Sequence, residues 1–251
     1  MRHRFLAGSI THFKIIFAII IVLSLPGTSF AGVNKKIACK ISARLKIPKW
    51  YHEGLYFDGK NIWVNNGENG KTWVVDPSDG AVTREIEPAG TFTEAVTSKE
   101  NGKYIVTDWD SKKIYTARID NGRMEPENEV SVAPAHPAGA IWNGTSLFVM
   151  TWTRGPTGTR FHLLKMDDKF NILSSRAITN ISEPSQLAWD GKNLWVSSWY
   201  TPRIYMIDEP TLEIRGTVRS PAKKTTGIVW AGKYLWVTGT YSDLYKMEFK
   251  K

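Results

Sequence analysis

The chain has 251 residues, of which 42% are hydrophobic and 23% are charged. This composition excludes disordered, collagen-like and multi-span membrane proteins, and it allows one large globular domain or two small ones. The single cysteine, Cys39, excludes a disulfide framework and a cysteine-based zinc site. The formal net charge of +9 is compatible with a nucleic-acid ligand, so the distribution of the charges has to be considered first.

The N-terminal segment has the features of a cleavable signal peptide. Basic residues precede an apolar run over 15–25, and small residues follow it up to Ala31. A run of 11 residues is short against the roughly 20 that span a bilayer as a helix, so a retained anchor is the alternative. We predict a signal peptide over 1–31 and an exported mature chain over 32–251, periplasmic or extracellular, without a membrane span after cleavage.

Removal of this leader also changes the charge argument. It takes away three positive charges and no negative one, which leaves a formal charge of +6 over 220 residues. The remaining Lys and Arg residues are scattered, with no run of five. A solvated basic surface accounts for them, and we expect no nucleic-acid partner.

The mature chain repeats a short pattern: a glycine, two variable residues, an aliphatic residue, usually an aromatic residue and usually valine. The five copies begin at Gly59, Gly102, Gly144, Gly191 and Gly232. Their spacings are 43, 42, 47 and 41 residues. A period in the forties with β-rich units is typical of propeller blades, each a four-stranded antiparallel sheet. We therefore predict an all-β fold, a five-bladed β-propeller.

Each repeat divides into four strands, A to D, by alternation and turn residues. Strand A precedes the glycine turn and strand B follows it. Strand C ends on a hydrophobic residue followed by an acid that begins a turn. These acids are Asp76, Asp120, Asp167 and Asp208.

The fifth repeat stops after its third strand, near Phe249. Hydrophobic residues alternate strictly with polar ones over 37–47, with Cys39 on the hydrophobic side. This N-terminal strand is predicted to complete the last blade, which would leave no open sheet edge. We expect one domain over 32–251, and a monomer.

The start of strand A and the end of strand B lie at the same rim of a propeller, so residues from both positions share one mouth of the central channel. The A-strand starts supply Glu53 and Glu94, and the B-strand ends supply Trp109, Trp152 and Trp199. Most of the other tryptophans recur at fixed places in the repeat and are expected to pack between blades. They are Trp63, Trp195 and Trp236 in strand B, and Trp142, Trp189 and Trp230 in strand A.

The two glutamates have more than one interpretation. Salt bridges would compensate their burial, and the candidate partners are Lys223, Lys224 and Arg154. An apolar wall and a second carboxylate would instead raise the pKa of a glutamate and suit it to proton transfer near neutrality. His52 and His136 lie near the same rim, but without chelating spacing, so we predict no metal and no cofactor. The insert 153–160 is expected at this rim as a lid.

Two motifs resemble a known family. Tyr51-His52-Glu53-Gly54-Leu55 opens the first repeat and Phe92-Thr93-Glu94-Ala95 opens the second. With the five units, they resemble the plant and bacterial type of glutaminyl cyclase, or glutamine cyclotransferase, a five-bladed propeller, over about 50–249. Trp109, Trp199 and the segment 237–248 belong to the same resemblance. It implies that Glu94 is the acid/base and that Phe92, Trp109 and Trp199 form the pocket for an N-terminal glutamine.

The chain departs from that family at several pocket positions. Ala138 stands where the family has Trp, Ser185 where it has Asn, and Thr240 where it has Lys. Ala95 also replaces a glycine. One aromatic wall, one amide and one cation are therefore missing from the resemblance.

We hypothesise an exported glutaminyl-peptide cyclotransferase that acts on a peptide or protein N-terminus, with Glu94 as its catalytic residue. Glu53 or Ser185 would hold the α-amine, and Thr240 or a nearby lysine would polarise the amide oxygen. The remaining substrate-binding residues would be Tyr51, Phe92, Trp109, Trp152 and Trp199. The alternative is a non-catalytic propeller that binds a peptide or small molecule in the aromatic funnel. A third interpretation is a metal-dependent lactonase-type propeller.

Overall fold

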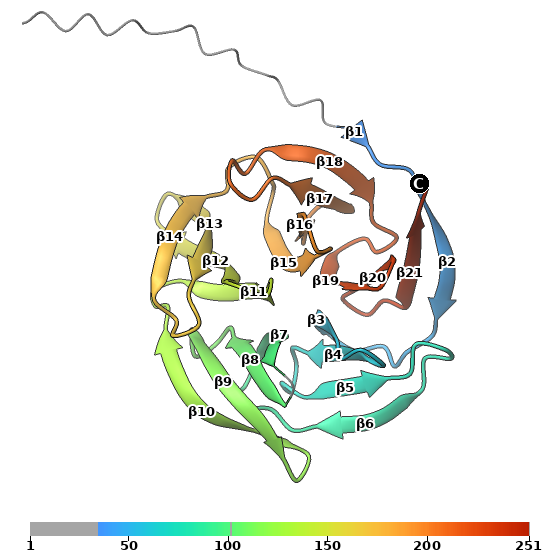
Figure 1. Cartoon of the computed structure of the whole chain (residues 1–251), viewed down its shortest axis with the longest axis horizontal. Coiled ribbons are helices and arrows are strands. Elements are labelled where there is room, and N and C mark those ends of the chain that lie inside the picture. Colours follow the sequence, from blue (N-terminus) through green and yellow to red (C-terminus); the bar gives the residue numbers. More distant parts are fainter. Residues whose placement is uncertain (1–34, 101, 251) are drawn as a thin grey trace, which may run out of the picture. The chain divides into compact units, whose positions relative to one another are not determined.

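The computed structural model describes residues 35–100 and 102–250, so the predicted signal peptide over 1–31 lies outside the described residues. The described residues form strands and no helix, and the strands make five sheets in a ring (Figure 1). This arrangement confirms the predicted all-β, five-bladed propeller. We call each sheet a blade. In each blade the strand that is named first below lies innermost (Figure 1).

The blades follow one another along the chain. Blade 1 consists of β3 (His52–Phe57), β4 (Ile62–Asn66), β5 (Thr72–Val75) and β6 (Val82–Ile86). Blade 2 consists of β7 (Thr93–Glu100), β8 (Lys103–Asp108), β9 (Lys113–Asp120) and β10 (Arg123–Ser131). Blade 3 consists of β11 (His136–Trp142), β12 (Leu147–Gly155), β13 (Gly158–Met166) and β14 (Ile172–Ala177). Blade 4 consists of β15 (Pro184–Trp189), β16 (Leu194–Ser198), β17 (Arg203–Ile207) and β18 (Ile214–Arg219), with β1 (Lys35–Lys36) added at its outer edge. Blade 5 consists of β19 (Thr225–Ala231), β20 (Tyr234–Gly239), β21 (Leu244–Phe249) and the N-terminal β2 (Cys39–Leu45).

Hydrophobic side chains gather between the blades. Five clusters of buried side chains are present among the described residues, one at each junction of neighbouring blades. Trp63, Trp195 and Trp236 belong to three of these clusters, and each has at most 3% of its surface exposed. The predicted packing role of these strand-B tryptophans is confirmed. Each blade buries its faces against its neighbours, so the core depends on the closed ring.

The turn between the first two strands of a blade explains the repeated sequence. In blade 1 the carboxylate of Asp58 accepts hydrogen bonds from two main-chain N–H groups of the turn, at 2.6 and 2.8 Å. It also accepts one from the indole N–H of Trp63, at 2.8 Å. Gly59 has φ = 95°, a conformation that favours glycine. Asp190 and Trp195 repeat the arrangement in blade 4.

Three of the four acids that end the third strand behave as predicted, and for the fourth, Asp120, no such side-chain hydrogen bond is present among the described residues. Asp76, Asp167 and Asp208 each accept hydrogen bonds from main-chain N–H groups of the following turn. These bonds satisfy donors that the strands leave unpaired. These three acids are therefore turn formers in the connection to the outer strand.

The N-terminal strand closes the ring, as predicted. β2 pairs antiparallel with β21 and so supplies the fourth strand of blade 5. The strand is interrupted by a bulge between Ile41 and Ala43 that the sequence alternation did not predict, and Ile41 is 53% exposed. Cys39 is half-buried rather than buried. The chain also makes an unexpected parallel pairing of β1 with β18, which ties its beginning to blade 4 as well.

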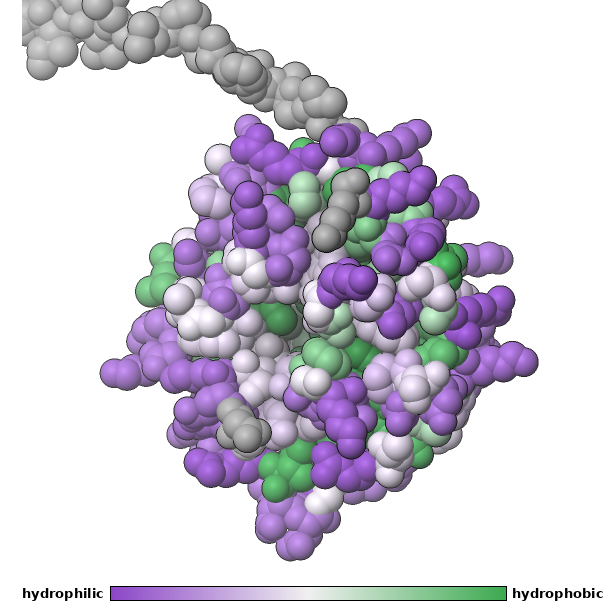
Figure 2. Space-filling model, turned by 45° about the vertical axis from the view of Figure 1, so that its right-hand side comes forward, coloured by the Kyte–Doolittle hydropathy of each residue, from purple (hydrophilic) through white to green (hydrophobic). Residues whose placement is uncertain are grey.

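The face of the propeller shown in Figure 2 is mostly hydrophilic, and its hydrophobic residues lie in small, separate patches. Among residues 35–100 and 102–250 there is no helix with the length and hydropathy of a membrane span.

Candidate functional site: an acidic, aromatic pocket at one mouth of the channel

A β-bulge lies at the same place in all five blades, where the innermost strand begins to pair with its neighbour. A bulge re-aims a side chain that regular alternation would direct into the sheet surface. The residues within the interrupted stretches include Glu53, Glu94, Ala138, Ser185 and Thr226, one from each blade. Four of these five, all except Thr226, line one pocket.

This rim pocket has a volume of about 350 Å³ and is formed by residues from blades 1 to 4. All predicted site residues except Thr240 line it. Its lining consists of Tyr51, Glu53, Phe92, Glu94, Trp109, Ala138, Trp152, Arg154, Thr159, Glu183, Ser185 and Trp199. The rim tryptophans Trp109, Trp152 and Trp199 therefore share one pocket with Glu53 and Glu94, as the strand directions predicted.

The main chain of Glu94 is anchored from two other blades. Its carbonyl oxygen accepts a hydrogen bond of 2.8 Å from the side-chain amide of Gln186 in blade 4. It accepts another of 3.3 Å from the amide of Asn65 in blade 1. Gln186 and Asn65 are both at most 1% exposed. Glu94 is thus held in a rigid setting even though its side chain faces a cavity.

The two glutamate side chains are buried acids without a basic partner. Glu53 is 4% exposed and Glu94 6% exposed, and neither forms an ion pair with a residue in 35–100 or 102–250. Burial raises the pKa of Glu53 well above its ordinary range. Burial likewise raises the pKa of Glu94, and the charges of Glu53, Asp108 and Asp110 raise it further. Salt bridging to the predicted basic residues therefore does not explain these acids, and each holds its proton to a higher pH than an exposed glutamate does.

One wall of the rim pocket is built around Trp109. The His136 ring stacks on this indole with centroids 4.5 Å apart, and its Nδ1 lies 2.9 Å from the Trp109 carbonyl oxygen. Trp152 meets Trp109 edge to face at 5.6 Å and donates its indole N–H to the Pro184 carbonyl oxygen at 2.6 Å. These contacts fix both rings, so the wall is preformed.

Tyr51, Phe92 and Trp199 form another part of the lining. Tyr51 lies edge to face against Phe92 with centroids 6.4 Å apart. The main-chain N–H of Phe92 donates to the Asp108 carboxylate at 2.7 Å, which orders the loop before β7. Burial, followed by the charges of Glu53 and Glu94, raises the pKa of Tyr51. The Tyr51 hydroxyl therefore stays protonated and can donate a hydrogen bond into the pocket.

The insert 153–160 is a hairpin rather than a separate loop. β12 and β13 continue their pairing outward as far as Gly155 and Gly158. Arg154 and Thr159 of this extension line the rim pocket, and the Arg154 guanidinium lies 5.6 Å from the Trp109 ring centroid. The insert does lie at the predicted rim, and it brings a cation to the pocket.

Two features of the pocket were not predicted as parts of the site. Gln186 anchors Glu94, and Glu183 lines the pocket with a buried Oε2 that has no hydrogen-bond partner among the described residues. Glu183 also has φ = 44°, which is uncommon for a residue other than glycine. Both residues lie within two positions of Ser185 in the sequence. Their closeness to this repeat position is the one sequence feature that could have identified them.

Thr240 lies apart from the other predicted residues. It lines a neighbouring pocket with Lys223 and Lys224, and this pocket shares Tyr51 with the rim pocket. The position at which the resembled family has a lysine therefore does not line the rim pocket. Arg154 is the only cation that does so among the described residues.

The two histidines named in the metal hypothesis are engaged elsewhere. His52 places Nε2 2.8 Å from the Pro48 carbonyl oxygen and Nδ1 3.3 Å from the Thr238 hydroxyl, while His136 contacts Trp109. In the part of the chain that the structure describes, no group of three His, Cys, Asp or Glu side chains is placed to hold a metal ion.

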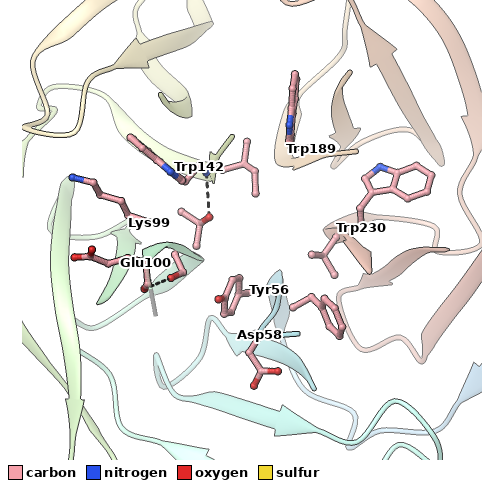
Figure 3. Close-up of a pocket in the computed structure, with 12 residues that line it drawn as sticks. Tyr56, Asp58, Lys99, Glu100, Trp142, Trp189 and Trp230 are labelled. Atoms are coloured by element: carbon pink, nitrogen blue, oxygen red, sulfur yellow. Dashed lines mark hydrogen bonds between the residues drawn. The ribbon is translucent and has the colours of Figure 1, made fainter. Parts of the chain in front are cut away.

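The other mouth of the channel holds a different pocket of about 530 Å³ (Figure 3). Trp142, Trp189 and Trp230, from the ends of three innermost strands, stand around it with Tyr56 (Figure 3). These tryptophans are half-buried. They pack against the hydrophobic clusters between the blades, as predicted, and they also line this pocket. Asp58 also lines this mouth, but its carboxylate is occupied by the turn. The rim pocket is the stronger candidate because buried, unpaired acids face it.

No known protein-family model matches the chain, and no curated protein matches it in sequence. Among solved structures it is similar to glutaminyl cyclase from Myxococcus xanthus, with a TM-score of 0.70 and 12% identity over 86% of this chain and 99% of that one. It is also similar to the PQQ-bound aldose sugar dehydrogenase of Streptomyces coelicolor, with a TM-score of 0.59 and 11% identity over 86% and 99%. A third likeness is to the β-propeller domain of Cps50 (Swd1) from Myceliophteria thermophila, with a TM-score of 0.51 and 11% identity over 85% and 100%. At such identities these likenesses establish the propeller fold and nothing finer.

Proposed function

We propose that the rim pocket binds the N-terminal glutamine of a peptide and converts it to pyroglutamate with release of ammonia. The observation that supports this most is the pair of buried, unpaired acids, Glu53 and Glu94, which face a cavity walled by aromatic rings. An α-amine complements such acids in charge, and the aromatic walls complement the aliphatic part of glutamine. The fold likeness to a glutaminyl cyclase agrees with this proposal.

The reaction needs one proton to move from the nucleophile to the leaving group. The α-amine nitrogen attacks the side-chain amide carbon and forms the lactam C–N bond, and the bond to the amide nitrogen breaks. Glu94, when ionised, takes the proton from the attacking nitrogen and returns it to the departing one, which leaves as ammonia. Its raised pKa suits both half-steps, because it makes the carboxylate a stronger base toward the amine and leaves the carboxyl able to return the proton.

The other pocket residues bind and orient the substrate. Glu53 or Ser185 accepts a hydrogen bond from the α-amine, and Phe92, Trp109, Trp152 and Trp199 confine the glutamine in the curled form that the ring closure requires. We assign the polarisation of the amide oxygen to Arg154 instead of Thr240, since Arg154 lines this pocket and Thr240 does not.

The test is to incubate the purified protein with a peptide that begins with glutamine and to follow ammonia release together with the mass of the peptide. We expect turnover that Glu94→Gln abolishes. Glu125→Gln is the matched control, because Glu125 is an exposed glutamate of β10, away from the pocket. If ammonia release by the unmodified protein equals that of Glu94→Gln, the cyclase proposal is wrong.

A non-catalytic binding function is the second candidate. Ala138 and Ser185 supply less aromatic surface and fewer hydrogen bonds than the Trp and Asn of the resembled family, and a pocket that keeps its tryptophans can still bind a peptide. Under this alternative a glutamine-initiated peptide quenches the tryptophan fluorescence, the quenching saturates as the peptide concentration rises, and the peptide is recovered unchanged.

A further inference from the structure

A second cavity adjoins the rim pocket. It has a volume of about 580 Å³ and shares Tyr51 with the rim pocket. We call it the lysine annex; it is lined by Tyr51, Pro221, Ala222, Lys223, Lys224, Thr240, Tyr241, Ser242 and Tyr245. Tyr51 therefore belongs to the walls of both cavities.

The two cavities differ in the acidic and basic side chains that line them: among the described residues, three glutamates accompany one cation, Arg154, in the rim pocket, and lysines without an acid line the annex. Glu53, Glu94 and Glu183 line the rim pocket, whereas the annex presents Lys223 and Lys224. Neither lysine forms an ion pair with a residue of the described ranges 35–100 and 102–250, and both are exposed. Two neighbouring cations without a protein anion attract an anionic group of a ligand.

Two further contacts shape the annex. The Lys224 ammonium lies 3.8 Å from the ring centroid of Trp199, a residue of the rim pocket, so the two cavities also approach each other at this indole. The Thr240 hydroxyl oxygen is buried and has no hydrogen-bond partner among the described residues. Glu68 contacts the annex lining, where it accepts a hydrogen bond of 2.6 Å from the Tyr241 hydroxyl. The annex thus offers two cations and a free hydroxyl to an anion.

We propose that the lysine annex binds a carboxylate of a peptide whose amino terminus occupies the rim pocket. This inference rests on the proposed function in one respect, which is that the α-amine of the peptide lies beside Glu53 and Glu94. The carboxylate can come from an acidic side chain next to the N-terminal residue or from the C-terminus of a dipeptide. The chain would then select peptides with an amine and a carboxylate a short distance apart.

The test compares kcat/KM for peptides matched in size. The first arm uses amidated tetrapeptides that begin Gln-Asp or Gln-Asn, and the second arm uses Gln-Ala with a free or an amidated C-terminus. We expect the carboxylate form to be favoured by about 3- to 10-fold in at least one arm, the size for one or two exposed ion pairs. The arm that shows the preference identifies the source of the carboxylate. The preference decreases at high salt because exposed charges are screened.

Lys223→Ala with Lys224→Ala tests the assignment to the annex. We expect the ratio of carboxylate to neutral peptide to fall to about one in this double variant. Lys192→Ala is the matched control, because Lys192 is an exposed lysine of the turn at the opposite mouth, and it should keep the ratio. Equal kcat/KM within both arms for the unmodified protein, or a ratio unchanged by the double variant, overturns the inference while the cyclase proposal stands.

If no peptide is cyclised, the cyclase proposal fails and the annex is judged by binding alone. Dissociation constants of the same four peptides, measured by calorimetry, then replace kcat/KM. A preference for the carboxylate forms that the double variant loses supports the annex, and equal dissociation constants reject it. The two failures are therefore distinguishable.

Discussion

The side-chain amide of Gln186 donates a hydrogen bond of 2.8 Å to the main-chain carbonyl oxygen of Glu94, which joins blade 4 to blade 2 across the central channel. The same amide donates to the Ala138 carbonyl oxygen of blade 3, at 3.1 Å. The other blades have Gly or Ala at the position of Gln186. A Cβ on Gly54 would collide with this amide and with the Glu94 carbonyl oxygen, and a Cβ on Gly139 would collide with the main chain at Ser185 and Gln186. One side chain thus fills the channel beneath the rim pocket and links three blades.

Gln186→Ala should destabilise the protein by about 1–3 kcal/mol, because two buried carbonyl oxygens lose a donor. It should also lower kcat more than it raises KM, since Glu94 loses its anchor but the walls of the pocket remain. Chemical denaturation and steady-state kinetics measure the two effects. Asn128→Ala, which removes an exposed amide on β10, is the control. An unchanged kcat would show that Gln186 is structural and does not position Glu94.

Glu53→Gln should move the acid limb of the pH–activity profile to lower pH. The charge of Glu53 raises the pKa of Glu94, so its removal lets Glu94 ionise, and act as a base, in more acidic solution. Asp110→Asn should move the limb in the same direction by less, because Asp110 contributes least to the raised pKa. A limb that stays in place in Glu53→Gln would mean that another group controls the profile.

Much of the fold could be predicted because the blade is a repeated unit. The Asp58–Gly59–Trp63 turn recurs in recognisable form, and its hydrogen bonds require the same residue types in blade 4. Strand directions then place the strand ends at a common rim. The short β1 pairing could not be predicted, because two lysines have no strand pattern. The bulge between Ile41 and Ala43 could not be predicted either, because hydrophobic and polar residues still alternate in the sequence across it.

The residues of the candidate site could be predicted where they occupy repeat positions, and not where they lie in turns or in the insert. Glu53, Glu94 and the rim tryptophans come from repeat positions, so the sequence locates them. Thr240 follows the end of β20, where the turn and not strand alternation sets its direction, and it lies in the annex instead. Arg154 depends on how far β12 and β13 continue as a hairpin, which composition does not show.

The free energy of unfolding should decrease as the pH rises above the ordinary glutamate pKa of 4.5, because of Glu94. Its pKa is higher in the folded state than in the unfolded state, so the unfolded chain releases the proton first and gains stability relative to the fold as pH increases. Glu94→Gln removes this contribution. Its Tm should match that of the unmodified protein near about pH 4 and exceed it near about pH 8. Parallel Tm curves for the two proteins across this range would contradict the raised pKa.

Asp58→Ala should lower stability by about 2 kcal/mol, because it leaves the buried indole N–H of Trp63 without an acceptor and frees two turn N–H groups. Asp190→Ala should cost a similar amount, since Asp190 makes the same bonds in blade 4. Asp79→Ala, which removes one bond in an exposed turn, should cost about 0.5 kcal/mol or less. Urea denaturation of the three variants provides the comparison, and equal losses would refute the special role of the tryptophan contact.

Arg154→Ala should reduce kcat/KM for a glutamine-initiated peptide by about 100- to 1,000-fold, the range for loss of one donor to a developing oxyanion. The guanidinium lines the rim pocket beside Trp109, where an amide oxygen can meet it. Arg154→Lys keeps the charge but loses the planar set of donors, so it should recover only part of the activity. Arg160→Ala is the control, because Arg160 belongs to the same hairpin and does not line the pocket. If all three variants lose activity equally, the loss comes from the hairpin and not from the cation, and Arg154 has no role in polarising the amide.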